Sequence, residues 1–326
     1  MSFSAIMLFI IGLVLVVVGS DWLVDGASDI ARRSGLSEFV IGLTIVGIGT
    51  STPEMVVSFL SAIRGNADMA VGNVIGSNIF NTFLILGITA VILPMEITRT
   101  NLRRDIPLNI FATLLLVLLG LKHTITGLDF LSDSLGRIEG ALFLAAFAYY
   151  LYVSFKDSKA DNDGKNAPDA PQKTYKHVIT PIILVLAGLF GLIFGGRLFV
   201  NGAVCIAQTL GWSDKFIAIT ILAGGTSLPE LATCIVAAVK KKGQLALGNI
   251  IGSNISNILL ILGGSALIHP LSTEAISGID LGFLTLASLF ILASAFTFGK
   301  NRLDRSEGVG MLVLEGIYMW LLISNL

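Results

Sequence analysis

Two glutamates lie inside apolar segments that are long enough to cross a membrane. Glu54 lies within the run from Phe39 to Ile63, and Glu230 lies within a similar run later in the chain. Each glutamate closes the same pattern, Gly-Thr-Ser-x-Pro-Glu, which covers residues 49–54 and 225–230. A charged side chain at the centre of a bilayer costs roughly 2.5–3.5 kcal/mol on insertion scales, so it marks a candidate functional site. Two such stretches at matched depth are hard to explain by packing.

The same stretches also have a purely structural interpretation. Ser51-x-x-Glu54 and Ser227-x-x-Glu230 fit the capping box that begins a helix, so each stretch could restart a helix after a break. Such a break does not exclude function. A helix interrupted within the membrane leaves backbone groups without partners, which is tolerated where they line a cavity or bind something. The break therefore predicts free backbone oxygens beside each glutamate.

A second repeated pattern follows each glutamate. It reads Gly-Asn-x-x-Gly-Ser-Asn-x-x-Asn and covers residues 72–81 and 248–257. Residues four apart share one face of a helix, so each copy predicts a polar face. These faces carry Asn73, Ser77 and Asn81 in the first copy and Asn249, Ser253 and Asn257 in the second. The glycines four apart also suit close helix packing. Both interpretations can hold, with glycines on one face and oxygens on the other.

The predicted ligand set contains only oxygen. Carboxylates, hydroxyls, amides and freed carbonyls suit hard cations such as Ca²⁺ and Na⁺, and they disfavour zinc or copper. Two carboxylates balance the charge of one Ca²⁺. They could also bind protons, because burial favours the neutral acid. Charge alone therefore leaves the coupling ion open between Na⁺ and H⁺, and no cofactor is expected besides the transported ions.

The composition places these patterns in a membrane protein. Of the 326 residues, 54% are hydrophobic and 13% are charged, whereas soluble domains carry about 25% charged residues. The expected surroundings are the lipid bilayer, with neither a nucleic acid nor an obligatory protein partner. Cys205 and Cys234 lack Cys-x-x-Cys or His spacing, so we expect them to be packing residues rather than a disulfide or a zinc site.

Windows of about twenty apolar residues predict ten membrane-spanning helices. The expected spans are near 3–20, 39–63, 69–93, 105–122 and 138–155, then 178–200, 216–239, 246–268, 279–298 and 307–323. A polar stretch with two prolines from 156 to 177 separates the two sets and predicts a linker. The predicted fold is all-α and polytopic, with residues 1–155 and 178–326 as two five-helix halves.

The two halves are copies of one another. Repeated residues between Gly19 and Pro94 recur 176 positions later, between Gly195 and Pro270. Five is an odd number, so the second copy must enter the membrane inverted, with the broken helices of both copies at the midplane. Inverted repeats with broken helices are typical of ion-coupled transporters. Sixteen of the 21 Lys and Arg residues lie on the side away from the N-terminus, which predicts a cytoplasmic linker and both termini outside a cell membrane.

The two patterns resemble the α-repeats of the cation/calcium exchanger superfamily, and within it those of the sodium/calcium exchanger branch. The α-repeats would cover residues 39–93 and 216–268, and the resemblance extends over the whole chain apart from the linker. It implies a secondary antiporter that exchanges Na⁺ for Ca²⁺ by alternating access, with the first and sixth helices sliding across a static core. It also implies one central calcium site flanked by sodium sites.

The resemblance implies a role for each matching residue. Glu54 and Glu230 would be shared acidic ligands, and Asn81 and Asn257 would line the centre. The other implied ligands are the carbonyls of Gly47, Thr50, Ala223 and Thr226 and the hydroxyls of Ser51, Ser77, Ser227 and Ser253. Potassium-dependent relatives have an aspartate where this chain has Asn81 or Asn257, so the two amides argue against potassium dependence.

Other functions stay open on the sequence. A Ca²⁺/H⁺ antiporter could use the same two glutamates, although proton-coupled relatives usually lack the Thr-Ser pair before Pro-Glu. A cation channel needs no inverted repeat. An intramembrane enzyme would need a base beside Ser51, and no predicted span has a histidine near its centre. Glu315, midway along the last span, is a further candidate, to which the resemblance assigns no role.

Overall fold

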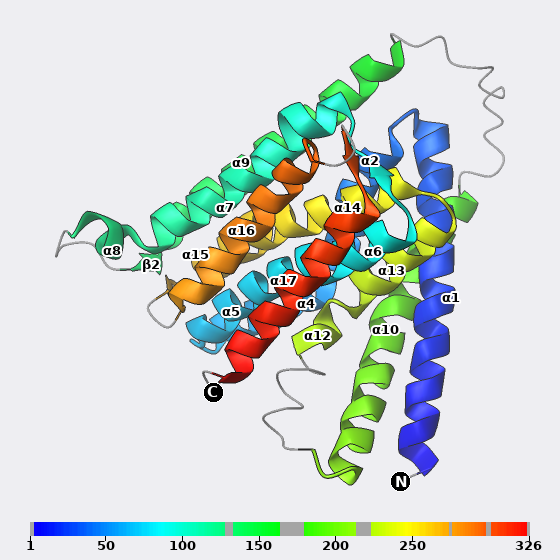
Figure 1. Ribbon diagram of the computed structural model, residues 1–326, viewed down its shortest axis with the longest axis horizontal. Coiled ribbons are helices and arrows are strands. Elements are labelled where there is room, and N and C mark those ends of the chain that lie inside the picture. Colours follow the sequence, from blue (N-terminus) through cyan, green and yellow to red (C-terminus); the bar gives the residue numbers. More distant parts are fainter. Residues whose placement is uncertain are drawn as a thin grey trace. The chain divides into compact units, whose positions relative to one another are not determined.

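The computed structural model describes residues 3–127, 133–163, 179–212, 223–273, 276–297 and 301–324, and most of these residues are helical (Figure 1). The chain forms two compact units. Unit 1 comprises Met1–Thr52 and Leu151–Asn249, and unit 2 comprises Pro53–Tyr150 and Ile250–Leu326. Each unit therefore contains segments from both halves of the sequence repeat.

Unit 1 is built around two long helices. Helix α1 (Phe3–Ser34) and helix α10 (Ile179–Thr209) lie side by side (Figure 1). Helix α1 continues well past the predicted end of the first span near residue 20, because polar residues lower hydropathy without breaking a helix. Both helices stop before a glycine with a left-handed backbone, Gly35 with φ of 70° and Gly211 with φ of 81°. These glycines are equivalent in the repeat.

Glycines allow the backbones of α1 and α10 to approach closely. A Cβ atom added at Gly19 would lie 2.8 Å from the carbonyl oxygen of Gly188. One added at Gly195 would lie 3.0 Å from the carbonyl oxygen of Gly12. Gly19 and Gly195 are equivalent in the repeat, as are Gly12 and Gly188, so the two contacts exchange partners. This is the small-residue packing expected between helices in a membrane.

The remaining helices of unit 1 are short and interrupted. They are α2 (Glu38–Ile41), the π-helical segment η1 (Gly42–Val46), α3 (Gly47–Thr50), α12 (Ala223–Thr226), α13 (Leu228–Val239) and the first half of α14 (Gly243–Ser256). Breaks follow α3 at Ser51 and α12 at Ser227, where ψ is 9° in each case. The breaks lie where the repeated Gly-Thr-Ser-x-Pro-Glu pattern predicts them. Of the span expected near 216–239, the part before Ala223 lies outside the described residues.

Unit 2 contains the continuations of both halves. From the first half come α4 (Thr52–Ile63), α5 (Ala67–Phe80), η2 (Asn81–Leu86), α6 (Gly87–Ile92), η3 (Asn101–Asp105), α7 (Ile106–Gly120) and α8 (Lys122–Thr126). Helix α9 (Arg137–Asp163) belongs to unit 2 as far as Tyr150 and to unit 1 from Leu151. From the second half come the end of α14, η6 (Asn257–Leu262), α15 (Gly263–Ile268), α16 (Gly278–Ser294) and α17 (Arg305–Ser324). Helix α9 runs into the predicted linker as far as Asp163, and linker residues 164–177 lie outside the described residues.

Unit 2 contains two short β-sheets, and in each a strand of one half pairs with a strand of the other half. Strand β1 (Met95–Glu96) pairs with β4 (Arg302–Leu303), and β2 (Ser134–Leu135) pairs with β3 (Leu271–Ser272), both antiparallel. Strands β1 and β3 are equivalent in the repeat, and β2 and β4 precede equivalent helices. Each strand of one half therefore pairs with a strand of the other half. Such reciprocal pairing is what a two-fold relation between the halves produces.

The helices are those of a polytopic membrane protein. Among the described residues, six helices are long and apolar enough to cross a membrane, and the bent pair Glu38–Thr50 with Thr52–Ile63 adds a seventh. Shorter apolar helices, α7, α13 and α16, lie at the other predicted spans. The all-α class is confirmed. The number of ten crossings and the inverted insertion of the second half stay predictions.

Candidate cation-binding site

In unit 1, the serine at the helix break of the first half is hydrogen-bonded to the glutamate of the second half. Glu230 lies in the first turn of α13 and is buried, as is Ser51 at the end of α3. The Ser51 hydroxyl donates a hydrogen bond of 3.0 Å to Glu230 Oε1. A hydrogen bond to a charged group contributes about 1.5–3 kcal/mol, so Ser51 fixes the direction of the carboxylate.

The capping-box interpretation is wrong for Ser227. This residue occupies the cap position of α13, yet its side chain makes no capping hydrogen bond. Proline at the second helical position, Pro229, has no N–H and removes one of the two donors that a capping side chain can use. The Ser227 side chain therefore does not cap α13.

Thr50 is tied to the helices around it. Its hydroxyl donates to Asn249 Oδ1 at 3.2 Å, and Asn249 Nδ2 donates to Cys234 Sγ at 3.2 Å. Unit 2 contains the equivalent of the second bond, because Asn73 Nδ2 donates to Ser58 Oγ at 3.0 Å. Asn73 and Asn249 thus connect neighbouring helices. The predicted polar face is divided between these connecting amides and the residues further along the helix.

Four buried asparagines in unit 2 form a symmetric network. Asn81 Nδ2 donates to Asn254 Oδ1 at 3.2 Å, and Asn257 Nδ2 donates to Asn78 Oδ1 at 3.0 Å. Asn78 and Asn254 are equivalent in the repeat, as are Asn81 and Asn257, so the two bonds are copies of one another. The amides of Asn78 and Asn254 are themselves held, by the Asn254 carbonyl oxygen at 3.0 Å and by the Thr82 hydroxyl at 2.9 Å.

This network leaves two amide oxygens with fixed directions. Oδ1 of Asn81 and Oδ1 of Asn257 are buried and have no hydrogen-bond partner in the described part of the chain. A buried acceptor without a partner costs about 1–3 kcal/mol, so its retention calls for an explanation. Amide oxygens are good ligands for Na⁺ and Ca²⁺. The arrangement supports the placement of Asn81 and Asn257 at a cation site.

The backbone widens where these two residues lie. The π-helical segments η2 and η6 begin at Asn81 and at Asn257. Single π-helical turns are rare and occur frequently at functional sites. They occur at equivalent positions of both halves, and each begins at a predicted ligand.

The other predicted ligands have the following positions. Glu54 is buried in the first turn of α4, and its backbone oxygen accepts from Asn73 Nδ2 at 3.3 Å. The hydroxyl-bearing residues Ser77 on α5 and Ser253 on α14 are also buried. Glu54 belongs to unit 2 and Glu230 to unit 1, so a shared role for the two carboxylates stays a prediction.

The predicted carbonyl ligands lie on α3 and α12. The Gly47 oxygen accepts from Ser51 N at 3.2 Å and from the Thr50 hydroxyl at 3.4 Å. Ala223 and Thr226 are the first and last residues of α12, and Thr226 Oγ1 is buried without a hydrogen-bond partner among the described residues. None of these contacts tests whether the four carbonyls bind a cation.

Each apolar run that contains one of the two glutamates has a negative net charge. No Lys, Arg or His occurs in the apolar runs 39–63 and 216–239, so neither run contains a cation to balance its glutamate. The described residues contain no cluster of three or more His, Cys, Asp or Glu side chains. Carboxylate oxygens supplemented by amides and hydroxyls suit a hard cation from solution rather than a transition metal.

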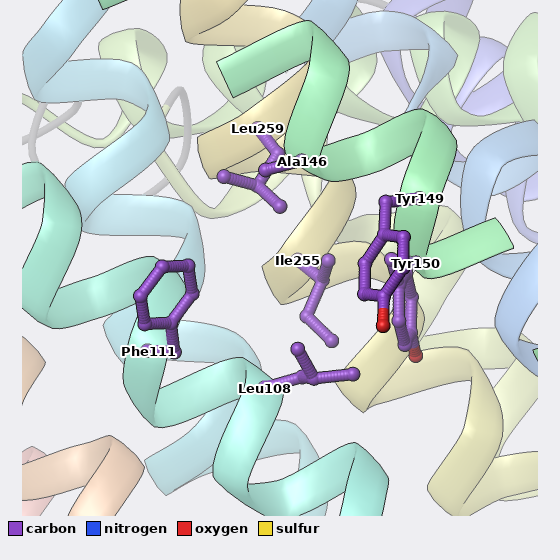
Figure 2. A pocket seen from close by; sticks show the side chains of 7 residues that line it. All are labelled: Leu108, Phe111, Ala146, Tyr149, Tyr150, Ile255 and Leu259. Carbon is purple, nitrogen blue, oxygen red and sulfur yellow. The ribbon is translucent and has the colours of Figure 1, made fainter. Parts of the chain in front are cut away.

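An apolar cavity elsewhere in unit 2 does not suit a cation. It has a volume of about 330 Å³ and lies between α7, α9 and the continuous helix formed by α14 and η6 (Figure 2). Its lining residues are Leu108, Phe111, Ala146, Tyr149, Tyr150, Ile255 and Leu259. Hydrocarbon and aromatic rings dominate this lining, so the cavity offers almost no ligands to a hydrated ion.

Comparison with known proteins decides the family. The sequence model described as "Sodium/calcium exchanger protein" matches residues 4–156 and 180–324. The chain belongs to the sodium/calcium exchanger family. Among its relatives in this family, the putative antiporter CaxA of Alkalimonas amylolytica is 41% identical, over 97% of this chain and 98% of that protein. The sodium/calcium exchanger MaX1 of Methanosarcina acetivorans is 34% identical, over 94% and 95%.

A solved structure of an exchanger has the same fold. The sodium-calcium exchanger NCX_Mj, soaked with 10 mM Na⁺ and 10 mM Sr²⁺, superposes with a TM-score of 0.83 and is 32% identical. The match covers 97% of this chain and 98% of that one. The family predicted from the repeated Gly-Thr-Ser-x-Pro-Glu patterns is thus confirmed, and so is the helical membrane fold.

Sequence reasoning did not identify the residues that orient the site. Asn78 and Asn254 belong to the repeated pattern, but helical spacing places them off the predicted polar face. The signal that could have singled them out is their presence in both copies, three residues before Asn81 and Asn257. Ser58 and Cys234 gave no such signal, because they differ between the copies.

Proposed function

We propose that this chain is a secondary antiporter that exchanges Na⁺ for Ca²⁺ across a cell membrane and carries Ca²⁺ outward. The observation that carries the proposal is the symmetric asparagine network, which holds Asn81 Oδ1 and Asn257 Oδ1 without hydrogen-bond partners. Two buried acceptor oxygens without donors need a ligand of positive charge or with donor groups, and they give nothing to a ligand that must accept a hydrogen bond. A hard cation such as Na⁺ or Ca²⁺ is a ligand that such oxygens bind well.

Glu54 and Glu230 supply the negative charge in this proposal. Two carboxylates neutralise one Ca²⁺, and the same oxygens bind Na⁺ when Ca²⁺ has left. The serines, the carbonyls of Gly47, Thr50, Ala223 and Thr226, and the two amides complete the ligand sets. The support for these assignments is membership in the exchanger family, the repeated motifs and the hydrogen bond from Ser51 to Glu230.

The amides at positions 81 and 257 bear on selectivity. An amide adds an oxygen ligand without adding charge, so the site has the charge for one divalent ion and no more. We expect exchange that does not require K⁺. The excess of Lys and Arg in the loops on one side supports both termini outside and the linker in the cytoplasm. In this orientation Na⁺ is released on the side of the membrane where the linker lies.

The test is ⁴⁵Ca²⁺ flux into proteoliposomes, with Na⁺, pH and voltage gradients imposed one at a time. An outward Na⁺ gradient alone should drive uptake. Uptake driven only by a pH gradient would replace this proposal with Ca²⁺/H⁺ exchange, and uptake that needs no second ion would indicate a channel. Glu54→Gln and Glu230→Gln should each abolish uptake, whereas the exposed control Glu96→Gln should retain it.

A further inference from the structure

Glu315 is a buried carboxyl group that the proposed exchange site does not use. It lies on α17, the red helix in Figure 1, with 5% of its surface exposed. Its Oε2 atom has no hydrogen-bond partner in the described part of the chain. Gly308, Met311, Glu315 and Tyr318 are all buried and recur every three or four residues, so they form the packed face of the helix.

In the described segments that pack against α17, no cation compensates this carboxyl group. Segments α6 and η2 pack against α17 and contain no titratable side chain, and α16 contains only Asp280. On α17 itself, Arg305 and Glu307 are at least two helical turns away. Glu307 is buried as well, but it accepts hydrogen bonds from the Thr297 hydroxyl at 2.8 Å and from the Asp304 amide at 3.1 Å. Of the two buried glutamates of α17, only Glu315 lacks such donors.

Two polar residues, Tyr318 and Asp280, follow Glu315 towards a helix end. Tyr318 lies one turn further along the same face, and its hydroxyl donates to Asp280 Oδ1 at 2.8 Å. Asp280 lies in the first turn of α16 and is partly exposed. The Tyr318 ring packs against Phe283, with centroids 5.0 Å apart, which fixes its position. The phenol and the second acid are hydrogen-bonded to each other, and helical spacing places the first acid one turn from the phenol.

We propose that Glu315 is a proton-binding site, distinct from the cation ligands, and that Tyr318 and Asp280 connect it to the aqueous phase. An isolated buried carboxylate is costly, whereas the neutral acid is not. Ca²⁺ needs six to eight oxygens, which this cluster does not offer, so the ligand is H⁺. On release the O–H bond of Glu315 breaks and its proton binds the Tyr318 oxygen, while the proton that Tyr318 donates to Asp280 is transferred to that carboxylate. Asp280 then releases a proton to water, and no electron is transferred.

The test is infrared difference spectroscopy of the purified full-length protein across a pH change. A protonated carboxyl group has a C=O stretching band that a carboxylate lacks. The wild type should show one such band that Glu315→Gln removes and that the control Glu307→Gln retains. Tyr318→Phe should keep the band and slow its shift on transfer to D₂O. If Glu315→Gln does not fold, Glu315→Asp should displace the band instead.

Three results would overturn the proposal. They are a band unchanged in Glu315→Gln, no titrating band in the wild type, and a band that Na⁺ or Ca²⁺ removes at constant pH. The last result would make Glu315 a cation ligand. None of these measurements depends on transport, so a failure here is distinguishable from a failure of the proposed exchange activity.

Discussion

Gly248 offers a sharp test of the packing that positions Thr50. At this position α14 approaches α2, and an added Cβ atom would lie 2.2 Å from the carbonyl oxygen of Phe39. Ordinary contact begins at 3.4 Å, so one of the two backbones must shift by about 1 Å. Its repeat equivalent, Gly72, is a matched control, because an added Cβ atom there meets no other residue within 4 Å in the described part of the chain.

The expected change in the free energy of unfolding is the sum of two opposing contributions. Alanine is favoured over glycine in a helix by about 0.5–1 kcal/mol, and both variants gain this term. Overpacking a filled interface costs typically 1–3 kcal/mol, and only Gly248→Ala bears this cost. The free energies of unfolding of the two variants should therefore differ by about 1–3 kcal/mol. Gly72→Ala should be slightly more stable than the wild type.

The assay is thermal unfolding of both variants in the same detergent, followed by tryptophan fluorescence. At about 2–4 °C per kcal/mol for a chain of a few hundred residues, Gly248→Ala should unfold roughly 2–12 °C below Gly72→Ala. Displacement of Asn249, the next residue, should also weaken Na⁺ binding through Thr50. Equal unfolding temperatures for the two variants would show that α14 does not pack on α2 as described.

Two further predictions concern the end of α13. Lys241 has a left-handed backbone with φ of 60°, which strains a residue with a side chain, and its repeat equivalent is Gly65. Lys241→Gly should therefore raise the free energy of unfolding by about 1 kcal/mol, measured by thermal unfolding. An unchanged unfolding temperature would show that the backbone at Lys241 is not strained. Lys240 Nζ lies 2.7 Å from carboxylate oxygens of both Asp21 and Asp25. Burial alone would lower the pKa of Lys240, but the two carboxylates outweigh it and raise the pKa. This ion pair therefore stabilises the fold below the unfolded-state pKa of about 10.4, and its contribution is lost as pH rises through the higher folded value. Lys240→Gln should lack that alkaline loss of stability, and parallel pH profiles of the two proteins would contradict the assignment.

The sequence predicts most of the fold because its signals are local or repeated. Apolar windows locate the helices, and the offset of 176 residues aligns α5, η2 and α6 with α14, η6 and α15. The breaks at Ser51 and Ser227 follow from proline and glycine in the pattern. The extended end of α1 was missed, because hydropathy reports the membrane-spanning part of a helix and not its whole length.

The orientation of the site could not be predicted in the same way. The bonds from Asn81 to Asn254 and from Asn257 to Asn78 join residues more than 170 positions apart, and no local propensity specifies them. The π-helical turns at Asn81 and Asn257 likewise depend on packing rather than on residue preference. The sequence indicates which residue types meet a cation, whereas their directions depend on tertiary contacts.

We propose that one cation is bound by both halves of the repeat. Anomalous diffraction from crystals soaked in Sr²⁺, a heavy substitute for Ca²⁺, tests it most directly. The account predicts one strong peak with carboxylate oxygens of both Glu54 and Glu230 within about 2.3–2.6 Å, the range for Ca²⁺ ligands, allowing slightly more for the larger ion. A peak bound by one glutamate alone, or separate peaks at the two glutamates, would contradict it.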